Sequence, residues 1–241
     1  MTTFICKHPF SMIEIHPDGN VYPCCLQWCN YYSFGNIFEN DFEEIWNGER
    51  AREFRKSVLD GTYSHCNLEM CQGTSTISTN STLEIENSEK LQKFPLYIKF
   101  CHDSSCNLCC VICRPARIMN SAEKATQLDA MITPRLLPIL RDAKTVSLNG
   151  SGELFASKHC RKLVSEVVRQ YPEIKFAVHS NGLLCDETNC AELGILDKMS
   201  SVQISIHAIN KKTYERIVIG SNYDRVWKNV EWLSKLKKAG K

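Results

Sequence analysis

The sequence has almost no net charge and no long apolar run. Its 241 residues include 29 Lys and Arg against 27 Asp and Glu, a formal net charge of +2, so it offers neither a broad basic field for nucleic acid nor an acidic tail. No apolar stretch approaches the roughly 20 residues that a membrane helix requires. The first residues also lack the basic segment and long apolar run of a secretory signal. These absences argue against a nucleic-acid-binding, membrane-bound or exported protein and predict a reducing, cytoplasmic location.

Cysteine, by contrast, is abundant, with 14 residues. In a chain without an export signal, cysteines bind metal ions or clusters more often than they form disulfides. Three of them, Cys106, Cys110 and Cys113, follow the strand-like residues 95–100 with the spacing C-x3-C-x2-C, if Cys109 is a bystander. Three thiolates this close together can hold three corners of a cubane iron–sulfur cluster, which is usually held by four. A fourth iron without a protein ligand is open to a substrate or cofactor and predicts a reactive site.

A C-x3-C-x2-C motif on the loop after a first strand resembles the signature of the radical S-adenosylmethionine (SAM) enzymes. The resemblance implies that Cys106, Cys110 and Cys113 hold a catalytic [4Fe–4S] cluster whose open iron binds the amino and carboxylate groups of SAM. It also implies a flavodoxin- or ferredoxin-type electron donor and reductive cleavage of SAM to a 5′-deoxyadenosyl radical. For this stretch alone, a zinc site with His102 or Cys101 as the fourth ligand remains the alternative.

Residues 1–75 have the composition of a small, cysteine-rich α+β module rather than of an apolar-core domain. Two alternating segments, residues 12–16 and 21–25, flank a Pro-Asp-Gly-Asn turn in which Pro fixes φ and Gly permits a positive φ. Such a hairpin can bring Cys6 and Cys24 together. A helix follows, stopped by Gly61, and it delivers Cys66 and Cys71. Its apolar side consists of Ala51, Phe54, Val58 and Leu59.

The layout C-x12-G-x4-C, helix, C-x4-C, with the segments PDGNVYPCC, GNI and EEIWNGERAREFR, resembles the SPASM/twitch auxiliary-cluster domain attached to many radical SAM enzymes. The resemblance implies a second [4Fe–4S] cluster with the ligands Cys6, Cys24, Cys66 and Cys71. Cys25 and Cys29 are further thiols that could replace one of these ligands. The closing spacing is C-x4-C where C-x2-C is commoner, and the module precedes the catalytic part, whereas in most of the family it follows. A structural zinc module with four cysteine ligands is the alternative.

Residues 76–93 form a polar, turn-prone linker, and from Phe94 onward strand and helix patterns alternate. We expect strands at 96–101, 145–149, 174–179 and 202–207 and helices that include 161–169, 190–198 and 222–238, the last capped by Ser221 or Asn222. This alternation predicts right-handed crossovers and a parallel sheet whose active edge lies at the carboxyl ends of the strands.

Polar motifs follow three of these strands. They are NGSGELF with Gly152 and Glu153, HSNG with Ser180 and Asn181, and QISIHA with Ser205. In this order they resemble the GGE, ribose-side and fourth-strand motifs of the radical SAM family. The resemblance implies that Glu153 receives the amino group of SAM, that Ser180 and Asn181 lie at its ribose, and that Ser205 points at it.

Two features depart from the family pattern. Ile112 stands where many members carry an aromatic residue over the adenine, so stacking would be lost. Residues 94–241 also contain only about four of the six βα units, which implies a C-terminally incomplete partial (β/α) barrel that is poorly soluble or inactive alone.

The sequence therefore favours an oxygen-sensitive radical SAM enzyme with one auxiliary cluster that modifies a peptide, a protein or a small molecule. Two other functions stay open. One is an iron–sulfur electron-transfer protein without SAM chemistry, and the other is a zinc-stabilised interaction module.

Overall fold

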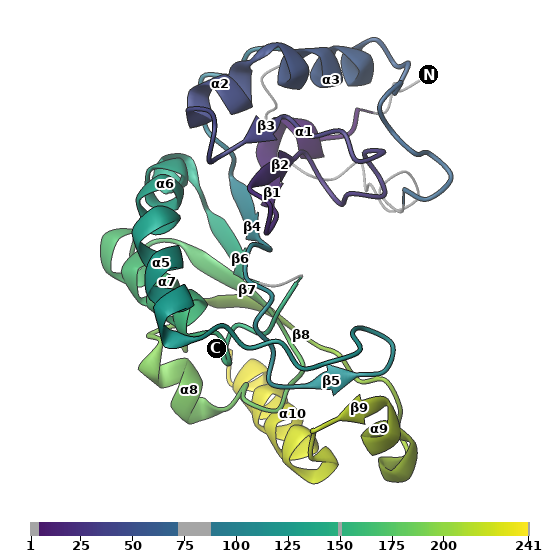
Figure 1. The fold of residues 1–241 in the computed structure, drawn as a ribbon, viewed down its shortest axis with the longest axis vertical. Helices are drawn as coiled ribbons and strands as arrows, with labels where there is room; N and C mark the ends of the chain where they lie inside the picture. Colours follow the sequence, from purple (N-terminus) through teal and green to yellow (C-terminus); the bar gives the residue numbers. More distant parts are fainter. Residues whose placement is uncertain (1–4, 72–87, 149–150, 241) are drawn as a thin grey trace. The chain divides into compact units, whose positions relative to one another are not determined.

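The structure, a computed structural model, describes residues 5–71, 88–148 and 151–240 (Figure 1). It is a mixed α/β structure that divides into two compact units, Met1–Lys99 with Ile139–Ala143, and Phe100–Pro138 with Lys144–Lys241. Of the predicted linker, residues 76–87 lie outside the described residues. We expected the second domain to begin at Phe94, whereas the second unit begins at Phe100. The Phe94 N–H donates to Asp142 Oδ2 at 2.8 Å, and both residues belong to the first unit.

The first unit contains a small sheet with the strand order β3-β2-β1-β4. Strands β1 (Met12–Ile15) and β2 (Asn20–Tyr22) form the predicted hairpin, with Glu14 opposite Tyr22, and β2 pairs with β3 (Gly35–Asn36). Strand β4 (Tyr97–Phe100) lies beside β1 and reaches the boundary of the unit.

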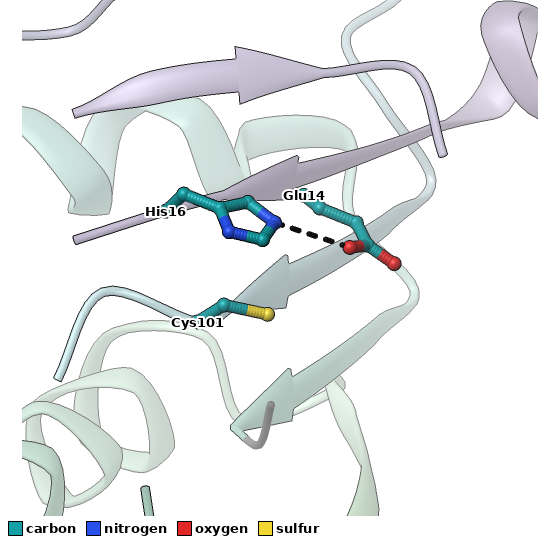
Figure 2. A group of neighbouring side chains, drawn as sticks. All are labelled: Glu14, His16 and Cys101. Atoms are coloured by element: carbon teal, nitrogen blue, oxygen red, sulfur yellow. Dashed lines mark hydrogen bonds and ion pairs between the residues drawn. The ribbon is translucent and has the colours of Figure 1, made fainter. Parts of the chain in front are cut away.

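Glu14 is a buried carboxylate on β1 that is paired twice within this unit. Lys99 Nζ lies 2.9 Å from one of its oxygens, and Figure 2 shows the His16 ring directed at the other, at 3.3 Å. Burial raises the pKa of Glu14, but the hydrogen bonds and charges of His16 and Lys99 outweigh it and leave the pKa below its ordinary value. The pairing is needed because an isolated buried carboxylate would be strongly destabilising.

Within its described residues the first unit also contains the helices α1 (His8–Ser11), α2 (Phe42–Asn47) and α3 (Glu49–Leu59). The predicted apolar side of α3 is confirmed, with Ala51, Phe54 and Val58 buried and Leu59 half-buried. The same helix buries Arg55, whose guanidinium lies 4.2 Å from the Trp46 ring centroid and donates to the carbonyl oxygens of Pro9 and Glu89. Burial lowers the pKa of Arg55 to about 9.

The second unit contains three parallel strands in the order β6-β7-β8: β6 (Thr145–Leu148), β7 (Lys175–Ser180) and β8 (Met199–Ile204). Helix α7 (Lys158–Gln170) connects β6 to β7, and α8 (Glu187–Glu192) connects β7 to β8. Helices α5 (Ala122–Met131) and α6 (Thr133–Leu136) precede β6, and α9 (Lys211–Ile217) and α10 (Tyr223–Lys238) follow β8. A 3-10 helix (Leu137–Asp142) lies between α6 and β6 in sequence, and its residues from Ile139 onward belong to the first unit. The alternation of strand and helix in this unit is as predicted.

The boundaries of two predicted elements are wrong. The helix expected at 190–198 is α8, at Glu187–Glu192, because Asp186 caps its start by accepting from Asn189 N–H at 2.9 Å and Gly194 follows its end at a φ of +69°. The fourth strand, expected at 202–207, is β8 and pairs with β7 from Met199 onward. The cap of α10 is Asn222, whose side chain accepts from Arg225 N–H.

The core of the second unit is apolar. It consists of Val146 and Leu148 on β6, Leu163, Val164 and Val167 on α7, and Phe176 and Val178 on β7, all buried. None of the helices in the described ranges is long and apolar enough to cross a membrane.

Candidate functional site

The loop that carries Cys106, Cys110 and Cys113 is held by the C-terminal part of the second unit. Its strand β5 (Cys109–Cys110) pairs antiparallel with β9 (Val218–Ile219), with Cys110 opposite Val218. The N–H of Val111 extends this ladder by donating to the Ile217 carbonyl at 3.0 Å. The loop is therefore held at two points, at its start after β4 and at β5 by the pairing with β9.

A small apolar cluster lies under this loop. Leu108, Tyr214, Val218 and Val226 are buried together, and Cys106 and Cys110 pack against them. Leu108 is 1% exposed, so it anchors the loop between two of the predicted ligands.

The Cys110 thiol lies within electrostatic reach of both Cys106 and Cys113. Burial, followed by the charges of Cys106 and Cys113, raises the pKa of Cys110, and burial also raises the pKa of Cys106. Cys113 is exposed. The Cys109 thiol donates to the Arg114 carbonyl at 3.6 Å, and its charge also raises the pKa of Cys110. Three cysteine thiols on one loop match the soft ligand preference of an iron–sulfur cluster.

Arg114 is a functional candidate that sequence reasoning missed. Its guanidinium donates to Cys113 Sγ at 3.5 Å and to the carbonyls of Ser104 and Ser151 at 2.8 and 2.6 Å. Its positive charge therefore lies beside the thiols, where it favours thiolate, and it links the cysteine loop to the loop that contains Gly152 and Glu153. No spacing in the sequence marks this arginine, because its three partners come from loops whose folding decides the contact.

Glu153 is the centre of a second group of polar side chains. It is 2% exposed and accepts hydrogen bonds from the Ser180 hydroxyl and the Asn181 N–H, each at 2.8 Å. Burial raises the pKa of Glu153 to about 7, and the bonds from Asn181 and Ser180 oppose this rise. A buried carboxylate with a pKa near neutrality can accept a cation, because the cation stabilises the charged form.

Gly152 sets the position of this carboxylate. A Cβ atom there would lie 2.5 Å from the carbonyl oxygens of Asp103 and Ser105, so only glycine fits. The neighbouring Glu153 N–H donates to that Ser105 carbonyl at 2.7 Å. The segment before the cysteine loop and the glutamate loop are thus in direct backbone contact.

Asn181 connects Glu153 to the cysteines. While its N–H binds the carboxylate, its side-chain amide donates to Asn107 Oδ1 at 2.9 Å and lies 3.9 Å from Cys106 Sγ. Gly182 follows at a φ of +81°, and a Cβ there would meet Ile204 at 2.8 Å, so both conformation and space require glycine.

Ser205 lies apart from this group. Its hydroxyl is 2.9 Å from His179 Nε2, and side chains alternate along β7, so His179 and Ser180 point to opposite faces of the sheet. Only the Ser205 N–H reaches the group, by donating to the Ser180 carbonyl at 3.0 Å. The structure therefore brings Glu153, Ser180 and Asn181 together and leaves the Ser205 side chain on the other face.

A buried polar network supports the segment that leads into the cysteine loop. The Asp103 carboxylate accepts from the Ser157 hydroxyl at 2.5 Å, from Ser105 N–H at 2.7 Å and from Asn120 Nδ2 at 3.0 Å. Next to it, His102 Nε2 lies 2.8 Å from His159 Nε2 and is fully buried. Burial and the charge of His159 lower the pKa of His102 to about 3, so His102 is neutral near pH 7.

The first unit gathers a second set of thiols. The pKa of Cys66 is raised to about 12 by burial and by the charges of Cys6 and Cys71. The pKa of Cys6 is raised to about 11 by burial and by the charge of Cys71. The charges of Cys6 and Cys66 also raise the pKa of Cys24, so Cys24 lies within electrostatic reach of both. The pKa values of these cysteines therefore depend on one another, and their assignment as the ligands of one cluster stays a prediction.

Cys29 lies near these thiols. The Cys24 thiol donates to the Cys25 carbonyl at 3.7 Å and the Cys29 thiol donates to the Leu26 carbonyl at 3.5 Å. The neighbouring Cys29 sulfur raises the pKa of Cys24, the Cys24 thiol lowers that of Cys29, and the charge of Cys29 also raises that of Cys66. Cys29 is fully buried. The sequence shows it only as one of two spare thiols, because the turn that directs it inward has no distinctive pattern.

Comparison with known families agrees with this second site. Residues 6–73 match the model of SPASM, an iron–sulfur cluster-binding domain. No curated protein matches the chain. The N-terminal part of this chain is thus a SPASM-type iron–sulfur cluster-binding domain.

Proposed function

We propose that the protein is a radical SAM enzyme. In this proposal Cys106, Cys110 and Cys113 hold a catalytic [4Fe–4S] cluster, and Glu153, Ser180 and Asn181 bind SAM beside it. The observation that carries the proposal is the position of Asn181, which contacts both the Glu153 carboxylate and Cys106 Sγ. A ligand with one end at the open iron and an ammonium group at Glu153 would span this short distance.

The residues of the chain have separate roles in such a site. Glu153 accepts the ammonium group, and Ser180 and Asn181 hold the two carboxylate oxygens of Glu153 in place. Arg114 offsets negative charge at the thiolates, and Gly152 leaves room for the backbone contact that fixes Glu153. When bound, the cluster supplies the electron that cleaves SAM reductively to a 5′-deoxyadenosyl radical. Ser205 keeps its predicted role at SAM only if its hydroxyl turns away from His179.

The SPASM domain supports this class, because such domains accompany many radical SAM enzymes that modify peptides or proteins. A peptide, protein or small-molecule substrate and a flavodoxin- or ferredoxin-type donor therefore complete the proposal. Its competitor is an iron–sulfur electron-transfer protein without SAM chemistry, which would also contain an iron–sulfur cluster-binding domain.

Anaerobic reconstitution with iron and sulfide, followed by dithionite and SAM, tests the proposal. We expect about eight irons per chain, four in each cluster, and formation of 5′-deoxyadenosine and methionine. Cys106→Ala, Cys110→Ala and Cys113→Ala should each abolish the product, whereas Cys109→Ala, the matched control, should retain it. About eight irons without product would support electron transfer alone, and zinc without iron would support a zinc-stabilised module.

A further inference from the structure

A buried asparagine on α10 binds the turn that carries Asn181. Asn229 is 6% exposed, and its side-chain amide donates to the carbonyl oxygens of Gly182 and Leu183, at 2.8 and 3.3 Å. In the described part of the chain, no backbone N–H donates to either carbonyl. Asn229 therefore supplies the hydrogen bonds of both carbonyls, and its loss would leave them unpaired against the helix.

The same face of α10 packs against this turn. Val226 lies three residues before Asn229, on the same side of the helix, and is 1% exposed. A Cβ at Gly182 would lie 3.1 Å from Val226 Cγ1 and 2.8 Å from Ile204 Cγ2, so the turn contacts both α10 and the end of β8. Helix α10 therefore holds the turn by one apolar and one polar contact.

A single peptide unit connects Asn229 to Asn181. The Gly182 carbonyl, which accepts from Asn229, and the Leu183 N–H belong to the same planar peptide. That N–H donates to Asn181 Oδ1 at 3.0 Å. With its oxygen held in this way, the Asn181 amide directs its nitrogen to Asn107 Oδ1 at 2.9 Å. Rotation of this one peptide would therefore release the Asn181 side chain.

We propose that Asn229 is a positioning residue for the binding of SAM, because it orients Asn181 toward Glu153 and Cys106. The inference rests on the proposed function, which assigns these residues to the SAM site. Both amide donors of Asn229 are used by the turn, so its effect reaches the ligand through Asn181. Without these donors, the Gly182–Leu183 peptide is free to rotate, and Asn181 no longer keeps its place between the carboxylate and the cysteine loop.

Two variants at position 229 test this inference. Asn229→Asp has the same shape as asparagine but replaces the donor nitrogen by oxygen, and Asn229→Ala removes the donors without adding a charge. The matched control is Val164→Ala, which shortens a buried side chain in the apolar core on α7 and lowers stability there rather than at the turn. Circular dichroism establishes that each variant is folded, and urea unfolding measures how far each is destabilised.

Equilibrium dialysis of the anaerobically reconstituted protein against radiolabelled SAM is the first measurement. We expect the dissociation constant of SAM to rise about tenfold or more in both variants at position 229 and to keep its wild-type value in Val164→Ala, at equal iron content. The second measurement is amide hydrogen exchange, which needs no cluster. Exchange at residues 181–183 should be faster in Asn229→Asp and Asn229→Ala, whereas Val164→Ala should speed exchange on α7.

Two results would overturn the proposal. One is a wild-type dissociation constant in both variants at position 229, and the other is an equal rise in Val164→Ala, which would mean that lost stability alone weakens binding. If the wild type binds no SAM although both clusters are complete, the proposed function fails instead. The exchange at residues 181–183 then decides the role of Asn229: faster exchange in its variants upholds its hold on the turn, and unchanged exchange refutes it.

Discussion

At the scale of single residues, some side chains of the candidate site can be predicted from the sequence and others cannot. Glu153, Ser180 and Asn181 can be predicted because each follows a recognisable strand and a glycine marks the turn. Arg114 and Cys29 cannot, because their roles depend on loops whose paths no local pattern sets. Ser205 shows the limit of the approach, since its motif is legible but its hydroxyl lies with His179 on the opposite face from Ser180.

The raised pKa of Glu153 predicts a pH-dependent stability. Burial moves this pKa from 4.5 to about 7, so the folded protein binds a proton more tightly than the unfolded chain does. The resulting stability is present below pH 4.5 and is lost as the pH rises through about 7. Relative to Glu153→Gln, the free energy of unfolding of the wild type should fall by on the order of 3 kcal/mol over this pH interval. Urea unfolding between pH 4 and pH 8 measures this loss, and the exposed Glu173→Gln serves as the control. Parallel pH profiles for wild type and Glu153→Gln would contradict the prediction.

Gly152→Ala should be destabilising, because the added methyl group would meet two backbone carbonyl oxygens at 2.5 Å. We expect a loss of about 1 to 3 kcal/mol in the free energy of unfolding, typical of overpacking. Gly61→Ala is a suitable comparison, since nothing lies within 4 Å of its Cβ position and only its φ of +77° opposes the change. Thermal or urea unfolding measures both, and an equal cost at the two glycines would show that the close contact at Gly152 carries no extra strain.

At the scale of elements, the sequence predicts most of what lies near the site. The hairpin β1–β2, helices α3, α7 and α10, and strands β6 and β7 are confirmed, because hydrophobic periodicity and turn residues agree over each of them. The helix expected at 190–198 fails because Asp186 and Gly194 set the ends, and capping overrides the apolar pattern. The pairing of β5 with β9 joins two-residue strands far apart in sequence, and no period can reveal strands so short.

The β5–β9 ladder offers a matched pair of variants. Val111 is 59% exposed, so its side chain contributes little, but its N–H bonds to the Ile217 carbonyl. Val111→Pro removes this donor, whereas Val111→Ala keeps it. We expect Val111→Pro to lower the iron bound at Cys106, Cys110 and Cys113 and to speed amide hydrogen exchange in residues 217–219. Equal iron content and exchange in the two variants would show that the ladder does not hold the loop.

At the scale of the whole molecule, the two cysteine sets lie in two separate compact units. The sequence predicts this division, because cysteine spacing dominates the first part and strand–helix alternation the second. The start of the second domain at Phe94 stays a prediction, and no sequence pattern marks the bond from the Phe94 N–H to Asp142 within the first unit.

This division predicts that the SPASM site and the proposed second iron–sulfur site load independently. Cys66→Ala should reduce the iron of the SPASM domain without affecting the second site, and Cys110→Ala should do the reverse. Iron and sulfide analysis of each single variant and of the double variant measures this, with additive losses expected. A single substitution that empties both sites would show that loading of one depends on the other.

The ladder between β5 and β9 also has a consequence for biosynthesis. Cys110 leaves the ribosome long before Val218, its partner in that ladder, and the apolar residues Tyr214 and Val226 beneath the loop also come late. Until they emerge, the nascent loop has neither of these supports, and closing so long a separation is slow compared with local folding. Insertion of iron at these cysteines should therefore follow translation rather than accompany it.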